Sequence, residues 1–167
     1  MIRSVRRLLP VLCGLVLLSS CGVVNAVTGT KKYTQQSPSM GATIPVGSTV
    51  TADVVDPGDY RPTRGDIVVF QPPASWEIPA HVPFLKRVVA IGGDTVQCCD
   101  KQHRLLLDGK PAGEPYVEAT ADNPPFDKVT LGPDEIFILG DARAESGDSA
   151  EHGPVGSDTV IGVVRTD

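Results

Sequence analysis

Short apolar segments separated by turn-forming residues are the feature that most restricts how this chain can fold. Beyond residue 36 these segments are only as long as strands, and none repeats at the period of 3.6 residues that a helix would show. The candidate strands are residues 48–55, 66–70, 84–91, 94–97, 104–107, 135–139 and 160–164. Clusters of Asp, Pro and Gly lie between them, and Asp108-Gly109 after residues 104–107 predicts the tip of a hairpin. The pattern predicts a mostly β fold: a single compact domain of coiled antiparallel strands, with few or no helices.

The charge balance argues against one large class of partners. The chain of 167 residues carries 15 Lys and Arg against 20 Asp and Glu, a net charge of −5. A protein that binds the phosphate backbone usually carries a basic stripe that releases counterions. We therefore expect no nucleic-acid partner.

Residues 1–20 have the pattern of an export signal or a short membrane anchor. Three arginines and no acid precede the apolar run Leu8–Leu18, which is too short for a comfortable transmembrane helix. The run ends in Leu18-Ser19-Ser20-Cys21, which looks like a bacterial lipobox whose Cys21 would be diacylated. Two alternatives stay open: ordinary cleavage after Val24-Asn25-Ala26, or retention of residues 8–24 as an uncleaved anchor. Each places the chain from about residue 30 on the extracytoplasmic face of the cytoplasmic membrane, with residues 21–36 as a tether and 37–167 as the domain.

The remaining cysteines, Cys98 and Cys99, are neighbours in the sequence. Such a pair can close a small disulfide ring or remain as two thiols, and an oxidising compartment permits either. With Asp100 and His103 the pair lacks the usual spacing of metal ligands. We expect no metal site and no cofactor.

Two serines flank a proline at residues 37–39. Ser37 and Ser39 lie in a stretch without periodicity, where Ser and Pro are common turn residues. Taken alone, this segment is typical of a polar turn.

Two cations interrupt the apolar segment 84–91. Side chains alternate along a strand, so Lys86 shares one face with Phe84 and Val88 while Arg87 lies on the other. An edge lysine that prevents aggregation is one interpretation. The other is chemical: burial lowers the pKa of a lysine, and a neutral amine can take the proton of a serine hydroxyl. Arg87 stays charged, so a buried Arg87 needs a carboxylate.

The segment 140–149 offers those carboxylates and a further hydroxyl directly after an apolar strand. Asp141 and Asp148 are the candidate partners of Arg87, and Ser146 is a candidate to orient a lysine base. A solvated loop is the alternative interpretation of this segment.

Together these segments resemble the type I signal peptidase (leader peptidase) family of membrane-bound serine proteases. The similarity runs from about Tyr33 to Val164 and keeps the family's order. The matching stretches are Ser37-Pro38-Ser39-Met40 for the nucleophile segment, residues 64–70 for a conserved strand, 86–94 for the lysine segment, and 140–149 with 153–155 for the last.

The resemblance implies a Ser/Lys dyad, with Ser39 as nucleophile and Lys86 as general base. Ser146 would orient Lys86, and Ser37 would donate to the oxyanion hole beside the Ser39 backbone N–H. The implied fold is that of a signal peptidase. The implied substrates are exported preproteins, cut after a small residue next to the lipid surface of the membrane.

Several positions depart from the family's pattern. The departures are Ala42 for the usual Pro, Ala142 for Asn, Ala144-Glu145 for Asp-Asn, and Ala150 for Arg. Asp148 has therefore lost its usual charge partner. These changes keep open an alternative function, a catalytically weak or inactive lipoprotein that acts as a binding or accessory module.

One segment also suits a second enzyme class. Gly147-Asp148-Ser149 could be the serine segment of a chymotrypsin-like protease with His81 as base. The glycines that should follow that serine are absent, and the chain is short for two barrels.

Overall fold

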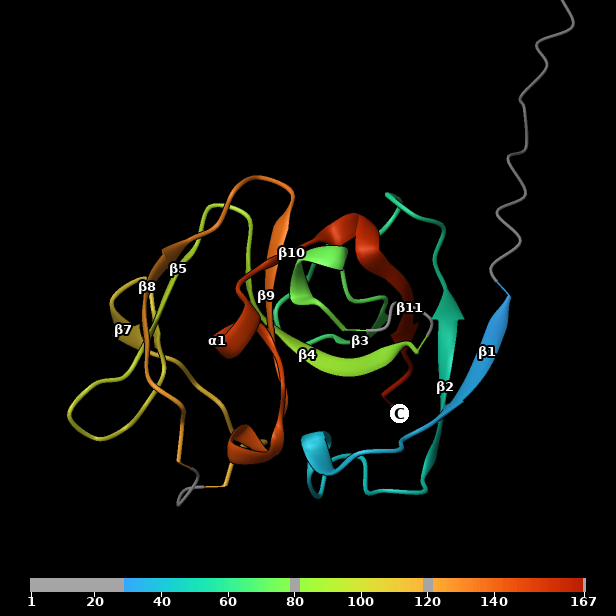
Figure 1. Cartoon of the computed structure of the whole chain (residues 1–167), viewed down its shortest axis with the longest axis horizontal. Helices are drawn as coiled ribbons and strands as arrows, with labels where there is room; N and C mark the ends of the chain where they lie inside the picture. The colour runs from blue at the N-terminus through green and yellow to red at the C-terminus, as the bar shows by residue number, and fades with distance from the viewer. Residues whose placement is uncertain (1–28, 79–81, 119–121, 167) are drawn as a thin grey trace, which may run out of the picture.

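The computed structural model describes residues 29–78, 82–118 and 122–166, which hold eleven strands, one short α-helix and four 3-10 turns (Figure 1). The strands are β1 Thr30–Thr34, β2 Thr49–Val54, β3 Ile67–Phe70, β4 Phe84–Ile91, β5 Thr95–Cys98, β6 Leu106–Leu107, β7 Lys110–Pro111, β8 Phe126–Thr130, β9 Glu135–Leu139, β10 Val155–Gly156 and β11 Val160–Val164. The helical elements are η1 Pro38–Met40, η2 Ala74–Trp76, η3 Arg143–Glu145, α1 Ser149–His152 and η4 Ser157–Thr159.

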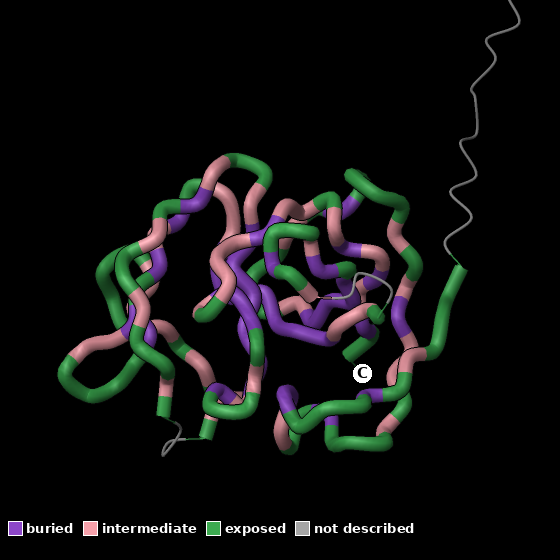
Figure 2. Tube along the Cα trace, viewed as in Figure 1, coloured by how far each residue is buried: buried purple, intermediate pink, exposed green. Residues whose placement is uncertain are grey.

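The larger sheet has seven strands in the order β1-β2-β11-β3-β4-β9-β10, and every neighbouring pair is antiparallel. Strand β4 lies in the interior of this sheet, between β3 and β9, and its residues 85–90 are all buried. Figure 2 shows the buried trace running through β4 and β9. A strand covered on both faces explains why residues 84–91 are apolar almost without alternation.

The smaller sheet has four strands in the order β7-β6-β5-β8 and lies beside the larger one (Figure 1). The chain passes from β4 to β5 through Gly92-Gly93, and a Cβ on Gly92 would come 2.3 Å from the carbonyl oxygen of Pro133. Phe126 of β8 stacks on Phe137 of β9, with ring centroids 5.0 Å apart. The two sheets therefore share a hydrophobic core that extends from β9 under the smaller sheet.

All seven strands expected from the sequence are present, and the expected mostly antiparallel β architecture is confirmed. The Asp108-Gly109 turn joins β6 to β7, which pair antiparallel. Four strands lie outside the predicted ranges, and each is polar or very short: β1, β7, β8 and β10.

The structure moves one boundary of the expected organisation. Residues 30–34, assigned to a tether, form β1, and Thr30 to Thr34 pair with Asp53 to Thr49 of β2. The strand is polar because four of its five residues are exposed, so apolar periodicity could not reveal it. The sheet therefore begins at residue 30, before the boundary drawn at residue 36.

Residues 1–28 lie outside the described part of the chain, and so do the expected signal segment, its lipobox and Cys21. Within the described ranges, no helix has the length and hydropathy needed to cross a membrane. Cys98 and Cys99, whose state the sequence left open, form a disulfide at the end of β5.

Candidate active site

Ser39 lies on η1, a single 3-10 turn whose shape follows from its sequence. Pro38 begins the turn, and the N–H of Gly41 closes it by donating to the Pro38 carbonyl at 2.8 Å. Gly41 has φ 52°, a backbone conformation that favours glycine. Met40 is fully buried in a cluster with Ile44, so it anchors the turn and leaves Ser39 beside the sheet.

Lys86 approaches Ser39 from the middle of β4. Its Nζ lies 3.0 Å from Ser39 Oγ and 5.4 Å from the centroid of the Phe84 ring, on the face that strand alternation predicts. Lys86 is only 3% exposed, and this burial lowers its pKa to about 8, although the charge of Asp148 opposes the shift. A substantial fraction of the side chain is therefore a neutral amine in mildly alkaline solution.

Two further groups donate hydrogen bonds to the same hydroxyl oxygen. Ser37 Oγ donates to Ser39 Oγ at 3.1 Å, and Gln35 Nε2 donates to it at 3.4 Å. Gln35 is buried, and sequence reasoning missed it because nothing in the polar segment before Ser37 distinguishes it. Ser37, Ser39 and Lys86 are thus brought together as expected.

Arg87 forms a buried ion pair on the opposite face of β4. Its Nε and Nη2 donate to the two carboxylate oxygens of Asp141 at 2.9 and 2.7 Å, and its Nη1 donates to the Gly65 carbonyl. Thr43 Oγ1 also donates to Asp141, at 2.6 Å. This network joins the segment after η1 to β4 and to the end of β9, and Thr43 is a supporting residue that the sequence analysis did not name.

Asp148 has a different role from the one that charge pairing suggested. Asp148 is 2% exposed and accepts the backbone N–H groups of Gly140 at 2.9 Å and Ala150 at 3.0 Å. Asp141 alone of the two candidate carboxylates pairs with Arg87. Asp148 instead ties the loop after β9 to the first turn of α1, with its negative charge acting on Lys86.

Ser146 does not make the hydrogen bond to Lys86 that was expected of an orienting group. Its Oγ is buried and has no hydrogen-bond partner among the described residues. The side chain packs instead against Gly140, where a Cβ would come 2.3 Å from both Ser146 Oγ and the Ser39 carbonyl oxygen. Glycine at 140 is therefore needed to bring the loop this close to the nucleophile.

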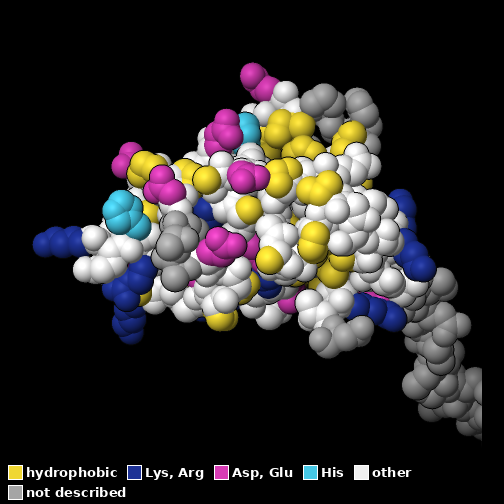
Figure 3. Space-filling model, turned by 90° about the horizontal axis from the view of Figure 1, so that it is seen from below, with side chains coloured by type: hydrophobic (Ala, Val, Ile, Leu, Met, Phe, Trp, Pro, Cys, Tyr) yellow, Lys and Arg dark blue, Asp and Glu magenta, His cyan; other side chains and the backbone are white. Residues whose placement is uncertain are grey.

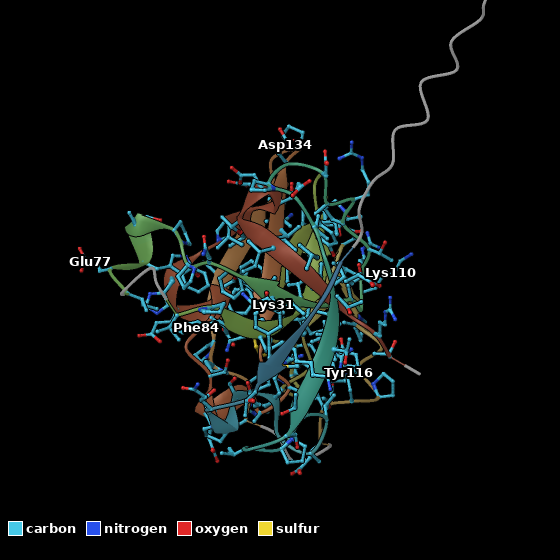
Figure 4. The ribbon with its side chains drawn as sticks, turned by 90° about the vertical axis from the view of Figure 1, so that its right-hand side faces the viewer. Lys31, Glu77, Phe84, Lys110, Tyr116 and Asp134 are labelled. Atoms are coloured by element: carbon cyan, nitrogen blue, oxygen red, sulfur yellow. A yellow bond between two sulfur atoms is a disulfide. The ribbon has the colours of Figure 1, made fainter. Side chains whose placement is uncertain are left out.

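A cavity of about 540 Å³ opens at Ser39 and Lys86. One wall runs from Lys32 in the second half of β1 to Ser37, and the other runs from Val82 to Lys86 at the start of β4. The apolar part of the lining consists of Val69, Ile78, Val82, Phe84 and Leu85. Figure 4 shows Phe84 at the start of β4, with η2 and Glu77 beyond it. An extended apolar peptide can lie between the two walls with one carbonyl at Ser39.

Within the described residues, Ser149 is not placed as the nucleophile of a chymotrypsin-like site. Ser149 is buried, and its Oγ accepts the backbone N–H of Ile138 at 3.1 Å, so it faces the sheet. His81 lies outside the described residues. Nor do the described ranges contain three or more His, Cys, Asp or Glu side chains grouped as metal ligands.

The site thus consists of a buried serine–lysine pair at a cavity in an antiparallel β domain, a geometry in which a neutral lysine can activate a serine hydroxyl. The chain belongs to the signal peptidase family, peptidase S26, whose sequence model matches residues 5–166.

Similar proteins agree with this assignment. Signal peptidase I of Mycobacterium tuberculosis (strain CDC 1551 / Oshkosh) is 31% identical over a match that covers 75% of this chain and 56% of the relative. Signal peptidase I of Leptolyngbya laminosa is 33% identical, covering 77% of this chain and 64% of the relative. The crystal structure of a signal peptidase I from Enterococcus faecalis V583 superposes with a TM-score of 0.51 at 26% identity, covering 64% of this chain and 98% of that one. The chain thus spans little more than half the length of the Mycobacterium relative.

Proposed function

We propose that the chain is a serine endopeptidase that removes signal peptides from exported preproteins by means of a Ser39–Lys86 dyad. The observation that carries the proposal is the 3.0 Å contact between Ser39 Oγ and the Nζ of a lysine that is 3% exposed. Neutral Lys86 takes the proton of Ser39 as Oγ attacks the carbonyl carbon of the scissile peptide bond. Protonated Lys86 then gives the proton to the leaving amine, and water releases the acyl group from Ser39.

Ser37 supports the same step by donating a hydrogen bond where negative charge develops. Its hydroxyl is 3.1 Å from Ser39 Oγ, close enough to turn toward the oxyanion beside the Ser39 backbone N–H. Loss of one such donor typically lowers the rate by about 10² to 10³. Ser37→Ala should therefore leave measurable activity, whereas loss of either member of the dyad should not.

The apolar cavity supports preproteins as the substrate class. Val69, Ile78 and Leu85 line the floor beside the nucleophile, which suits an extended apolar segment with small residues before the cleaved bond. The signal peptidase I relatives share this family, so the same substrates are proposed for this chain.

The test is cleavage of a fluorogenic peptide with small residues before the scissile bond by the full chain in detergent or lipid. We expect turnover that Ser39→Ala and Lys86→Met each abolish. Ser75→Ala on η2 and Lys128→Met on β8 remove the same groups at exposed positions outside the cavity and should retain activity. Wild-type turnover no higher than that of Ser39→Ala would reject the enzyme and leave the accessory lipoprotein as the better description.

We propose that the N-terminal segment keeps this site at the extracytoplasmic face of the membrane, through a lipid on Cys21. The support is the apolar run that ends at the lipobox sequence Leu18-Ser19-Ser20-Cys21. Mass spectrometry of the mature N-terminus should find diacylated Cys21. An N-terminus at Val27 would show ordinary cleavage, and an intact residue 1 would show an uncleaved anchor.

A further inference from the structure

A second hollow, of about 450 Å³, adjoins the nucleophile turn. Pro38 and Gly41, which flank Ser39 and Met40, line it together with η3. Glu145 at the end of η3 lines both this hollow and the cavity at Lys86. Figure 4 shows Phe84 of the cavity and Tyr116 of the second hollow apart from each other, to the left and right of the centre of the view. Because the two spaces share Glu145 and lie next to the turn that carries Ser39, a peptide that passes over Ser39 can reach both.

The second hollow is held at a fixed position relative to the nucleophile. The backbone N–H of Ala142 donates to the carbonyl oxygen of Ser39 at 3.0 Å. A Cβ on Gly41 would lie 3.5 Å from the Cβ of Ala142, so the turns η1 and η3 are in close contact. The hollow is thus part of the same rigid unit as the proposed dyad.

Negative charge in this hollow is largely uncompensated. Arg87 neutralises Asp141, and Arg143 pairs with Glu114 behind the surface. The exposed carboxylates that remain at the hollow are Glu118, Asp122 and Glu145, and none has an ion pair within the described ranges. Figure 3, which views the molecule from below, shows acidic side chains gathered among apolar ones on this face.

The floor between these carboxylates is apolar. Pro38, Ala42, Ala142, Ala144 and the ring of Tyr116 supply it. Ala142 and Ala144 occupy positions where the family usually has the polar residues Asn and Asp. Glu145 adds a negative charge where the family usually has Asn. A lysine or arginine side chain matches this surface, because its aliphatic stem covers apolar groups while its cation reaches a carboxylate.

We propose that this hollow binds a lysine or arginine of the substrate on the C-terminal side of the scissile bond, and that Glu145 determines this specificity. The proposal rests on the proposed peptidase function. The apolar cavity suits the apolar residues before the cleaved bond, which leaves the acidic hollow to the residues that follow it. Glu145 is singled out because, among the described residues, it is the one that borders both the cavity and the hollow.

The test uses peptides that are identical up to the scissile bond and carry Lys, Gln or Glu at the second to fourth positions after it. With the full chain in detergent at low salt, we expect kcat/KM for the Lys peptide to exceed that for the Glu peptide about tenfold, since each exposed ion pair contributes a factor of about 2 to 5. Glu145→Gln should reduce this ratio to about 3, mainly through KM. Sodium chloride at about 0.5 M should reduce it further by screening.

Asp127→Asn on β8 is the matched control, because it removes one exposed carboxylate that lines neither space. Its Lys-to-Glu ratio should equal that of the wild type. The same peptides, labelled for fluorescence anisotropy, should bind the full-length Ser39→Ala chain with the same order of preference, a readout that needs no turnover. Equal affinities for the Lys and Glu peptides, or equal effects of Glu145→Gln and Asp127→Asn, would overturn the proposal. If no peptide were cleaved, the proposed peptidase function would be rejected. The anisotropy measurement would then still test, separately, whether the hollow prefers Lys over Glu peptides.

Discussion

Lys86 combines two opposing electrostatic influences in one side chain. Burial disfavours the ammonium and lowers its pKa to about 8, while the carboxylate of Asp148 favours the ammonium. With this pKa the amine is mostly protonated at neutral pH, and the neutral form becomes the larger fraction above about pH 8. Arg87, one residue later, keeps its charge and needs the full carboxylate of Asp141.

A pH profile tests this balance. Because only neutral Lys86 can take the proton of Ser39, kcat/KM should rise with pH and level off above a midpoint near 8. Asp148→Asn removes the charge that stabilises the ammonium, so its midpoint should move to lower pH. Asp127→Asn, distant on β8, should leave the midpoint in place. A wild-type midpoint near the ordinary value of 10.5 would contradict the burial of Lys86 as the cause of its reactivity.

At the scale of elements, the sequence predicted strands far better than the contacts between them. Strand β4 was predicted with its observed limits, and alternation placed Lys86 on the face of Phe84. Gln35 was not predicted as a site residue, and the predicted contact of Ser146 with Lys86 was wrong. Both contacts depend on how two loops pack, which no local sequence pattern encodes. The family resemblance supplied the pairing of Ser39 with Lys86, since 47 residues separate them in the sequence.

The contact between η1 and the loop after β9 makes a specific demand on Gly140. A Cβ there would come 2.3 Å from the Ser39 carbonyl oxygen, a backbone atom that cannot move without displacing the nucleophile. Gly140→Ala should therefore lower the free energy of unfolding by about 1–3 kcal/mol. It should also lower kcat by about 10² or more, because small displacements of a nucleophile are costly.

Gly113→Ala is the matched control for this substitution. A Cβ on Gly113 meets nothing within 4 Å among the described atoms, and its φ is not in the left-handed region. Denaturant unfolding and peptide cleavage should both be close to wild type for Gly113→Ala. If Gly140→Ala behaved the same way, the close packing of the loop on Ser39 would be wrong.

At the scale of the whole molecule, Arg143 connects the smaller sheet to the active site. Its side chain is 1% exposed, and its Nε donates to the Gly140 carbonyl at 3.0 Å in the loop after β9. The other end of the guanidinium binds Glu114 and Asn123, which lie in the connection between β7 and β8. The loop that carries Asp141 and Ser146 is thus fastened to both sheets by one buried cation.

Replacing Arg143 should lower the stability of the whole domain and not only break a local contact. Arg143→Gln leaves the Glu114 carboxylate buried without its partner, so we expect the free energy of unfolding to fall by about 3–5 kcal/mol. Glu114→Gln should cost a similar amount for the reciprocal reason, and the double variant should cost clearly less than the sum of the two. Arg104→Gln, which breaks an exposed pair with Asp100, should leave the denaturation midpoint in place. Strictly additive effects of Arg143→Gln and Glu114→Gln in denaturant unfolding would show that the two side chains do not act as a pair.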